Sequence, residues 1–150
     1  MKAVLQRVLE AQVLVDRETV GHIGPGLLLY LGVQDGDTND DLISLAEKVL
    51  KLRIFPDSQE RMNFPITEVA GAILVISQFT LCADVRKGNR PSFSGAARPE
   101  EAHELYMEFV RYLSERGVPV QTGLFGAHME VSSINDGPVT LWLDSRENLG

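Results

Sequence analysis

Two short, uninterrupted runs of apolar residues constrain the fold of this chain more than any other feature. Residues 27–33 read Leu-Leu-Leu-Tyr-Leu-Gly-Val, and residues 71–76 read Gly-Ala-Ile-Leu-Val-Ile. Each run is short enough to be a strand, and neither shows the polar alternation of a strand with one face in water. The pattern therefore predicts two strands buried on both faces, the first of them central to a sheet.

Two segments show the apolar spacing of amphipathic helices. In residues 40–52 the apolar side chains recur at helical spacing, and Thr38 with Asp41 offers a capping-box-like start. In residues 99–116 a proline occupies the first position, two glutamates follow in the first turn, and Gly117 suits the position just past the end. We predict a helix in each segment.

The other strand-like segments indicate the class of fold. Residues 1–15 read as two strands around Leu9 and Glu10, and Asp136-Gly137 reads as a turn between the last two strands. Seven or so strands with only two helices do not fit alternating strand–helix units. We expect an α/β protein whose mostly antiparallel or mixed β-sheets form a barrel-like core, with two main helices packed outside. The remaining predicted strands are residues 20–23, 118–125, 129–134 and 139–143.

Length and composition fit one domain that spans residues 1–150. With 44% hydrophobic and 23% charged residues the chain reads as globular, and no apolar run is long enough to span a membrane. The N-terminal residues alternate and soon reach Arg7, unlike the apolar core of a secretory signal, so we expect a cytoplasmic protein. One cysteine, Cys82, excludes an internal disulfide, and the three histidines are too scattered to predict a metal site.

The charge of the chain limits how it can contact nucleic acid. A net charge of -7 argues against a uniformly positive binding surface, because phosphate contacts need local lysine and arginine. The best candidate for a local RNA contact is the turn-rich segment 86–92, Arg-Lys-Gly-Asn-Arg-Pro-Ser. The same composition also fits an ordinary solvated loop.

Polar groups follow the second apolar run where that strand is expected to end. Ser77, Gln78 and Thr80 supply two hydroxyls and an amide, and the backbone N–H groups at a strand end can stabilise an oxyanion. A serine or threonine nucleophile normally needs an activating base, yet no Ser-His-Asp order or lysine partner is visible beside this segment. The alternative is structural, with the hydroxyls only satisfying backbone groups at the strand end.

Gly137-Pro138 permits a second pair of interpretations. Proline removes a strand donor and glycine allows a close backbone approach, so the dipeptide can be an ordinary turn. Pushed into a pocket, the same peptide would present two rigid carbonyl oxygens with no side chain in the way. Such a group selects ligands by exclusion.

Together these motifs make the chain similar to the D-aminoacyl-tRNA deacylases along essentially its whole length. The resemblance implies a homodimeric cytosolic enzyme that hydrolyses the ester between a D-amino acid and the 3′-terminal adenosine of tRNA, without a metal or organic cofactor. The matching segments are residues 6–8, 24–27, 77–81, 86–88, 90–94, 125–127 and 135–140.

The resemblance also implies how substrates are selected. In that family the Gly-Pro peptide, here Gly137-Pro138, is cis and reaches into the partner subunit's active site, where its carbonyl groups block an L-side chain. Glycine has no side chain to clash, so we expect activity on glycyl-tRNA as well. Arg7 either buries its stem in a strand pair or braces the Gly-Pro loop.

Carried onto this chain, the family's active site implies roles for particular residues. Gln78, Phe79 and Thr80 would line the ester, beside Ser77, and the backbone N–H groups of Phe79 and Thr80 would polarise its carbonyl. Thr80 would act either as the nucleophile or only as a positioning group while the ribose 2′-hydroxyl assists water; the missing local base favours the second. The residues that would border the adenosine pocket are Phe125, Gly126 and Met129.

The sequence is also compatible with three other functions. The first is a non-enzymatic RNA-binding module that uses the basic loop and a pocket for a tRNA end. The second is a related deacylase that accepts L-alanyl esters, against which Ser77-Gln78 in place of Pro-Gln favours the D-specific type. The third is a structural dimer with a vestigial pocket.

Overall fold

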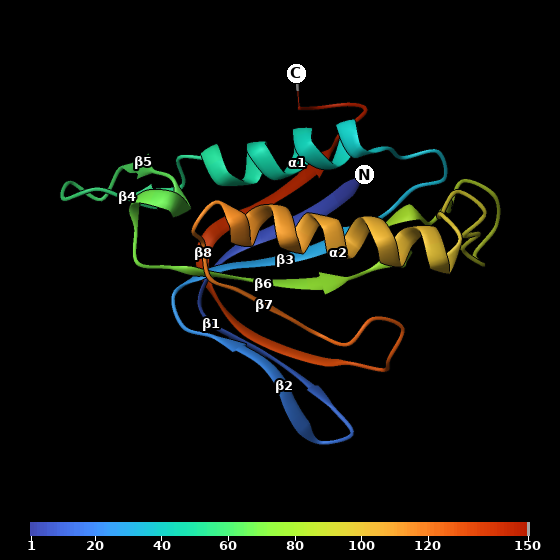
Figure 1. Cartoon of the computed structure of the whole chain (residues 1–150), viewed down its shortest axis with the longest axis horizontal. Coiled ribbons are helices and arrows are strands. Elements are labelled where there is room, and N and C mark those ends of the chain that lie inside the picture. Colours follow the sequence, from blue (N-terminus) through green and yellow to red (C-terminus); the bar gives the residue numbers. More distant parts are fainter. Residues whose placement is uncertain (150) are drawn as a thin grey trace.

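The structure is a computed structural model that describes residues 1–149. Six strands form one mixed sheet in the order β2-β1-β3-β6-β7, with β8 paired to β1, and β4 and β5 form a separate small hairpin (Figure 1). The strands are β1 (Lys2–Val15), β2 (Glu18–Ile23), β3 (Gly26–Gly32), β4 (Phe55–Pro56), β5 (Met62–Phe64), β6 (Ala72–Ser77), β7 (Val120–Thr122) and β8 (Glu130–Asp144), and the helices are α1 (Asn39–Lys51), α2 (Pro99–Glu115) and the 3₁₀ helices η1 (Ile66–Glu68) and η2 (Phe79–Cys82).

The two apolar runs form the middle of the sheet, as the sequence predicts. Strand β3 pairs antiparallel with β1 on one side and parallel with β6 on the other. Alternate residues face two different cores: Leu27 and Ile73 join the large cluster under the helices, whereas Leu28 and Leu74 join a smaller cluster on the other face. Both faces are therefore buried, which explains the lack of polar alternation.

Strand β1 is the element around which the sheet curls. Its whole length pairs with β8, from Lys2↔Asp144 to Leu14↔Glu130. Along the other edge its first half pairs with β3 and its second half, from Ala11, with β2. The prediction of two strands in residues 1–15 is wrong, because the expected break is only the point where one continuous strand changes partner.

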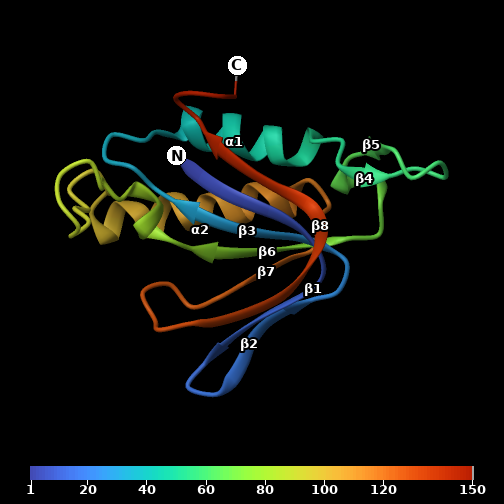
Figure 2. The same cartoon turned by 180° about the vertical axis from the view of Figure 1, so that it is seen from behind.

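The second half of β1 and the strand β2 swing away from the helices and come back toward β6 and β7 (Figures 1 and 2). A close approach occurs at Gly21, where a Cβ atom would lie 2.5 Å from the backbone oxygen of Thr122. The sheet is thereby nearly closed into a barrel, as expected from the sequence.

Strand β8 is also continuous, so the predicted hairpin turn at Asp136-Gly137 is wrong. Val8 pairs with Asn135 and Gln6 with Thr140, so residues 136–139 stand opposite Arg7 alone and form a bulge. The Gly137-Pro138 peptide in this bulge is cis. Both halves of β8 pair with the same strand, which leaves no second strand for a hairpin. The strand predicted at residues 118–125 is likewise shorter, β7.

Both main helices pack on the same face of the sheet (Figure 2, where the strands lie in front of α2). The capping box at the start of α1 is confirmed: the Thr38 N–H donates to Asp41 Oδ2 at 2.9 Å. Helix α2 begins at Pro99, and Gly117 beyond its end has a φ of +84°, which favours glycine. No helix within residues 1–149 is long and apolar enough to cross a membrane.

Candidate active site

A cavity of about 700 Å³ opens where β3 and β6 end and α2 begins. The apolar strand β6 ends at Ser77, and the polar residues Ser77 and Gln78 line the cavity at that end. Six of the residues predicted for the site lie in its wall. The lining residues discussed below are Ser77, Gln78, Phe79, Phe93, Arg98, Tyr106, Phe125, Gly126, His128 and Met129.

The segment after Ser77 turns out of the sheet in a way that exposes backbone donors. The Gln78 N–H still bonds to the Leu31 oxygen at 2.8 Å, after which η2 forms one 3₁₀ turn. The first N–H groups of a helix have no partner within it, and those of Phe79 and Thr80 have no acceptor among residues 1–149. Two adjacent N–H groups at a cavity can together stabilise an oxyanion.

Thr80 lies beside this pair but does not line the cavity wall. Its hydroxyl oxygen accepts a hydrogen bond from Gln78 Nε2 at 2.5 Å, and both the residue and the bond are exposed. Within the described chain, residues 1–149, no histidine, lysine or carboxylate side chain is hydrogen-bonded to Thr80. The geometry therefore supplies this hydroxyl with an orienting donor rather than with a base.

Aromatic rings form the walls of the cavity. Phe79 meets Phe93 edge-to-face at 5.1 Å between ring centroids. Elsewhere in the wall, Phe125 packs against His103 at 4.8 Å and Tyr106 at 5.7 Å between ring centroids. An apolar, aromatic cleft with few polar groups is typical of a site for a flat ring such as a nucleobase.

Tyr106 fixes α2 against the strand that ends at the cavity. Its buried hydroxyl donates to the backbone oxygen of Val75 at 2.8 Å. Burial raises the pKa of Tyr106 to about 12, so this hydroxyl stays protonated and remains a donor. This hydrogen bond thereby fixes the position of α2 relative to the end of β6.

Of the lining residues named above, sequence reasoning missed four: Phe93, Arg98, Tyr106 and His128. Phe93 and His128 stand next to or inside segments that carry the family resemblance, which was a usable signal. Arg98 precedes the proline of α2 and pairs with Glu101, so its pattern in the sequence is only that of a helix start.

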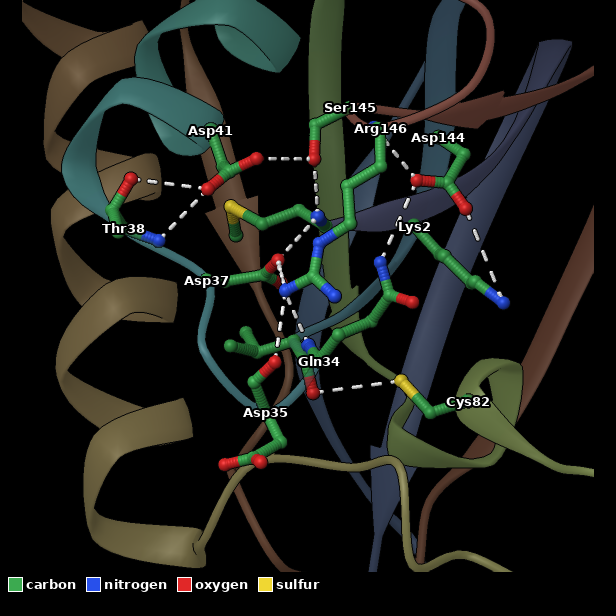
Figure 3. A network of polar contacts seen from close by, with 12 residues as sticks. Lys2, Gln34, Asp35, Asp37, Thr38, Asp41, Cys82, Asp144, Ser145 and Arg146 are labelled. Carbon is green, nitrogen blue, oxygen red and sulfur yellow. Dashed lines mark hydrogen bonds and ion pairs between the residues drawn. The ribbon is translucent and has the colours of Figure 1, made fainter.

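A polar network around the loop after β3 extends to Cys82 in η2 (Figure 3). Asp37, whose side chain is fully buried, accepts bonds from the Met1 α-ammonium at 2.9 Å and from Arg146 Nη2 at 2.8 Å. Its other oxygen accepts the Gln34 N–H at 2.6 Å. Each donor comes from a different segment, so the network locks the loop after β3 to both ends of the chain.

The same loop is tied directly to the cavity. The Val33 oxygen accepts the Ala97 N–H at 3.0 Å and the Cys82 thiol at 3.4 Å. Burial raises the pKa of the Cys82 thiol, so it stays neutral and acts as a packed donor rather than a nucleophile. No group of three or more His, Cys, Asp or Glu side chains within residues 1–149 is arranged to hold a metal ion.

Three predicted site residues, Arg7, Gly137 and Pro138, do not line this cavity. They lie next to Val8, which pairs with Gly26 at the start of β3, and therefore at the amino ends of β3 and β6. The cavity lies at the other end of β6, six residues or roughly 17 Å away along the strand. A single chain does not bring the two groups together.

Ion pairing and hydrogen bonds hold the bulge that contains Gly137-Pro138. Asn135 Nδ2 donates to the backbone oxygens of Arg7 at 2.9 Å and Val139 at 3.2 Å, which closes the bulge. The buried Arg7 guanidinium donates from Nη1 to the Ile54 oxygen, and its Nε lies 2.9 Å from Asp136 Oδ2. The Nε–H has no hydrogen-bonded partner in the described residues, so the Asp136 contact is an ion pair. Arg7 buries its stem between strands, as one sequence interpretation expected.

Comparison with known proteins identifies the family. The model of the D-Tyr-tRNA(Tyr) deacylase family matches residues 4–144. The D-aminoacyl-tRNA deacylase of Syntrophobacter fumaroxidans is 55% identical over 98% of this chain and 99% of its own length. The solved structure of a c-Myc DNA unwinding element binding protein is 39% identical, with a TM-score of 0.91 over 96% of this chain and 98% of that chain. That of a probable eukaryotic D-amino acid tRNA deacylase, 21% identical, shares the fold with a TM-score of 0.77 over 95% of this chain and 98% of that chain. This chain therefore belongs to the D-Tyr-tRNA(Tyr) deacylase family.

Proposed function

We propose that this protein hydrolyses the ester between a D-amino acid and the 3′-terminal adenosine of tRNA. The observation that carries the proposal is the pair of adjacent N–H groups at Phe79, which lines the aromatic cavity, and at its neighbour Thr80, neither of which has an acceptor within residues 1–149 of a chain of this family. The cavity, about 700 Å³, suits a nucleoside with a small acyl group. The activity removes D-residues from translation and returns the tRNA.

The reaction needs little from protein side chains, because an aminoacyl ester is already activated. The N–H groups of Phe79 and Thr80 bind the carbonyl oxygen of the ester as negative charge develops on it. Water adds to the ester carbon, the bond to the ribose O3′ breaks, and the water proton passes to that oxygen. With Thr80 oriented by Gln78 and without a base, we assign activation of the water to the ribose 2′-hydroxyl.

We further propose that Gly137-Pro138 acts in the active site of a second copy. The bulge and the cavity lie at opposite ends of β6 within one chain, so a homodimer is the arrangement that can bring them together. Exposed apolar side chains on the β1–β8 pair offer a contact surface for that copy. These are Leu9, Ile134 and Trp142, with 52%, 55% and 46% of their surface exposed.

In this arrangement the carbonyl groups of the Gly-Pro peptide exclude an L-side chain by contact. Rejection is then steric, and glycyl-tRNA, which has no side chain, is a substrate alongside D-aminoacyl-tRNA. We propose that the reaction takes place in the cytoplasm and without a metal or organic cofactor.

The test is deacylation of D-tyrosyl-tRNA and L-tyrosyl-tRNA, side by side, by catalytic amounts of protein with a metal chelator present. We expect rapid loss of the D-ester only. Survival of both esters would overturn the proposal and favour an RNA-binding module or a structural dimer. Loss of an L-alanyl ester with survival of the D-ester would favour the related L-specific deacylase instead.

A further inference from the structure

The loop of residues 85–91, which we call the basic loop, lies beside the cavity and contains three cationic side chains and no carboxylate. Its ends are joined by two backbone bonds between Asp84 and Ser92, at 2.7 and 2.9 Å. The next residue, Phe93, lines the cavity and packs on Phe79. The loop is thus attached directly to the wall of the site.

The three cations of the basic loop are not equivalent. Arg86 folds back onto Asp84, with Nε 2.9 Å from one carboxylate oxygen and Nη2 2.6 Å from the other. This pairing holds the pKa of Asp84 well below its usual range, so the carboxylate is charged and Arg86 is neutralised locally. Lys87 and Arg90 are exposed and make no ion pair or side-chain hydrogen bond within residues 1–149.

Eight of the fourteen arginines and lysines are paired to carboxylates, and Lys87 and Arg90 are two of the six that have no ion pair within residues 1–149. Arg7, Lys51, Arg111, Arg116 and Arg146 all have such partners. Lys87 and Arg90, three positions apart in a loop that leads into the cavity wall at Phe93, therefore form a local positive site on a chain of net charge -7. Phosphate groups bind such sites through local lysine and arginine, whatever the net charge of the protein.

We propose that Lys87 and Arg90 bind phosphates of the tRNA acceptor end, the strand that leads out of the cavity from the terminal adenosine. This inference rests on the proposed function, since that function places the adenosine in the cavity. The contacts add affinity for tRNA and read no base, because a phosphate carries no sequence information. Arg86 acts differently: its pair with Asp84 shapes the loop that presents the other two.

The experiment compares two substrates, D-tyrosyl-tRNA and the phosphate-free nucleoside 3′-O-(D-tyrosyl)adenosine. Single-turnover rates give the half-saturating concentration and the maximal rate of each at several salt concentrations. The test variant is Lys87→Gln/Arg90→Gln. The matched control is Arg17→Gln/Arg61→Gln, which removes the same charge from two exposed arginines that form no ion pair within residues 1–149. Arg61 lies between β4 and β5, at the opposite end of the molecule from the loop that precedes α2 (Figure 1).

For the test variant we expect the half-saturating concentration for D-tyrosyl-tRNA to rise about tenfold at low salt. Its logarithmic salt dependence should become shallower by about 0.7 for each phosphate that the variant no longer binds, the value for single strands. The maximal rate, and hydrolysis of the nucleoside, should stay at the level of the unmodified protein, which also shows that the variant folds. The control should keep the original salt dependence.

Equal salt dependence in the test variant and the unmodified protein would overturn the inference. An equally weakened control would also overturn it, because bulk charge rather than the basic loop would then explain binding. Filter binding of deacylated tRNA separates this inference from the proposed function. Binding of tRNA that depends on Lys87 and Arg90, without hydrolysis of either substrate, would support phosphate binding by the basic loop and overturn the proposed deacylase function.

Discussion

The Nε atom of Arg7 lies 2.9 Å from Oδ2 of Asp136, and this pair joins strand β1 to the bulge of β8 that contains Gly137-Pro138. The guanidinium side chain is 10% exposed and the carboxylate 38%, so the pair is shielded on one side only. Arg7 also holds the Ile54 oxygen, which ties the bulge to the segment after α1. Arg7 thus ties the bulge with the Gly-Pro peptide to β1 and does not line the cavity of its own chain.

Replacing Asp136 with asparagine should loosen this peptide more than it destabilises the fold. We expect the ratio of D-tyrosyl-tRNA to L-tyrosyl-tRNA hydrolysis to fall about tenfold, which corresponds to about 1.4 kcal/mol. The free energy of unfolding should fall by less than about 1 kcal/mol, as for an ion pair that is partly open to solvent. Both are measured on the same preparation, by single-turnover hydrolysis and urea unfolding.

Glu108→Gln is the control for this variant, since it breaks an exposed pair with Arg111 on α2. Such pairs contribute about 0–1 kcal/mol and should leave the D-to-L ratio unchanged. If Asp136→Asn kept the original ratio of D-tyrosyl-tRNA to L-tyrosyl-tRNA hydrolysis, the Arg7–Asp136 pair would not position the Gly-Pro peptide.

Thr80→Ala separates a nucleophile from a positioning group. Because Thr80 has a donor from Gln78 and no base, we expect the single-turnover rate on D-tyrosyl-tRNA to fall less than about tenfold. A tRNA that ends in 2′-deoxyadenosine should instead react about a hundredfold more slowly, as the assisting hydroxyl is missing. Abolished cleavage by Thr80→Ala with tRNA binding intact would make Thr80 the nucleophile.

Gly32→Ala should damage the active site by moving η2. A Cβ atom at Gly32 would lie 2.9 Å from the Gln78 oxygen and 3.1 Å from the Leu81 Cβ, so the segment with the free N–H groups must shift. Misplacing an oxyanion donor costs about a hundredfold in rate, and we expect a decrease of that order in the single-turnover rate. Gly24→Ala is the control, because a Cβ there meets nothing within 4 Å. A fully active Gly32→Ala protein would show that η2 tolerates displacement.

Glycyl-tRNA should be hydrolysed at a rate comparable with D-tyrosyl-tRNA if exclusion is the only basis of selection. The steric clash that rejects L-residues has nothing to act on in glycine. The measurement is a time course of both substrates under the same conditions. Survival of glycyl-tRNA while the D-ester disappears would require a positive contact to the D-side chain.

The hydrogen bonds of Glu47 should make the stability difference between the unmodified protein and a Glu47→Gln variant depend on pH. The Glu47 carboxylate accepts bonds from Lys51, Tyr112 and Arg116, and these bonds, the one from Lys51 foremost, lower its pKa from 4.5 to about 2. A carboxyl group whose pKa is lowered on folding stabilises the protein above its unfolded pKa and loses that effect as pH falls through its folded pKa.

Glu47→Gln should therefore be less stable than the unmodified protein at pH 6, by less than about 1 kcal/mol since the Glu47 side chain is only partly buried and water screens its ion pairs. The difference should shrink between pH 4.5 and about 2. Urea unfolding at pH 6 and near pH 2 measures it, with Glu68→Gln as an exposed control that breaks no ion pair among residues 1–149. If the difference in the free energy of unfolding persisted near pH 2, it would arise from packing rather than from the charge of Glu47.

The helices and the central strands were predictable because local signals decide them. The capping pattern at Thr38, the proline at position 99 and the apolar runs of β3 and β6 each act within a few residues. The wall formed by residues 77–79 was predictable for the same reason, since it follows directly from the end of β6.

The long strands were not predictable, because their continuity depends on distant partners. Residues near Leu9 look like a break until β8 pairs across them, and Asp136 looks like a turn residue until Arg7 lies opposite it. Trp142 pairs opposite Val4 on the sheet and yet remains 46% exposed, a burial that periodicity cannot forecast. Each of these features is a property of the tertiary pairing.

The pairing of β1 with β8 also decides when the molecule can finish folding. Lys2 pairs with Asp144, so β1 cannot complete its pairing until β8 has been synthesised. Until β8 leaves the ribosome, one whole edge of β1 is an uncovered row of hydrogen-bonding groups, open to other chains. Such high contact order makes closure of the sheet a slow step that follows the end of synthesis. A truncated or stalled chain of this protein is therefore an aggregation hazard, even when both helices and the central strands are already complete.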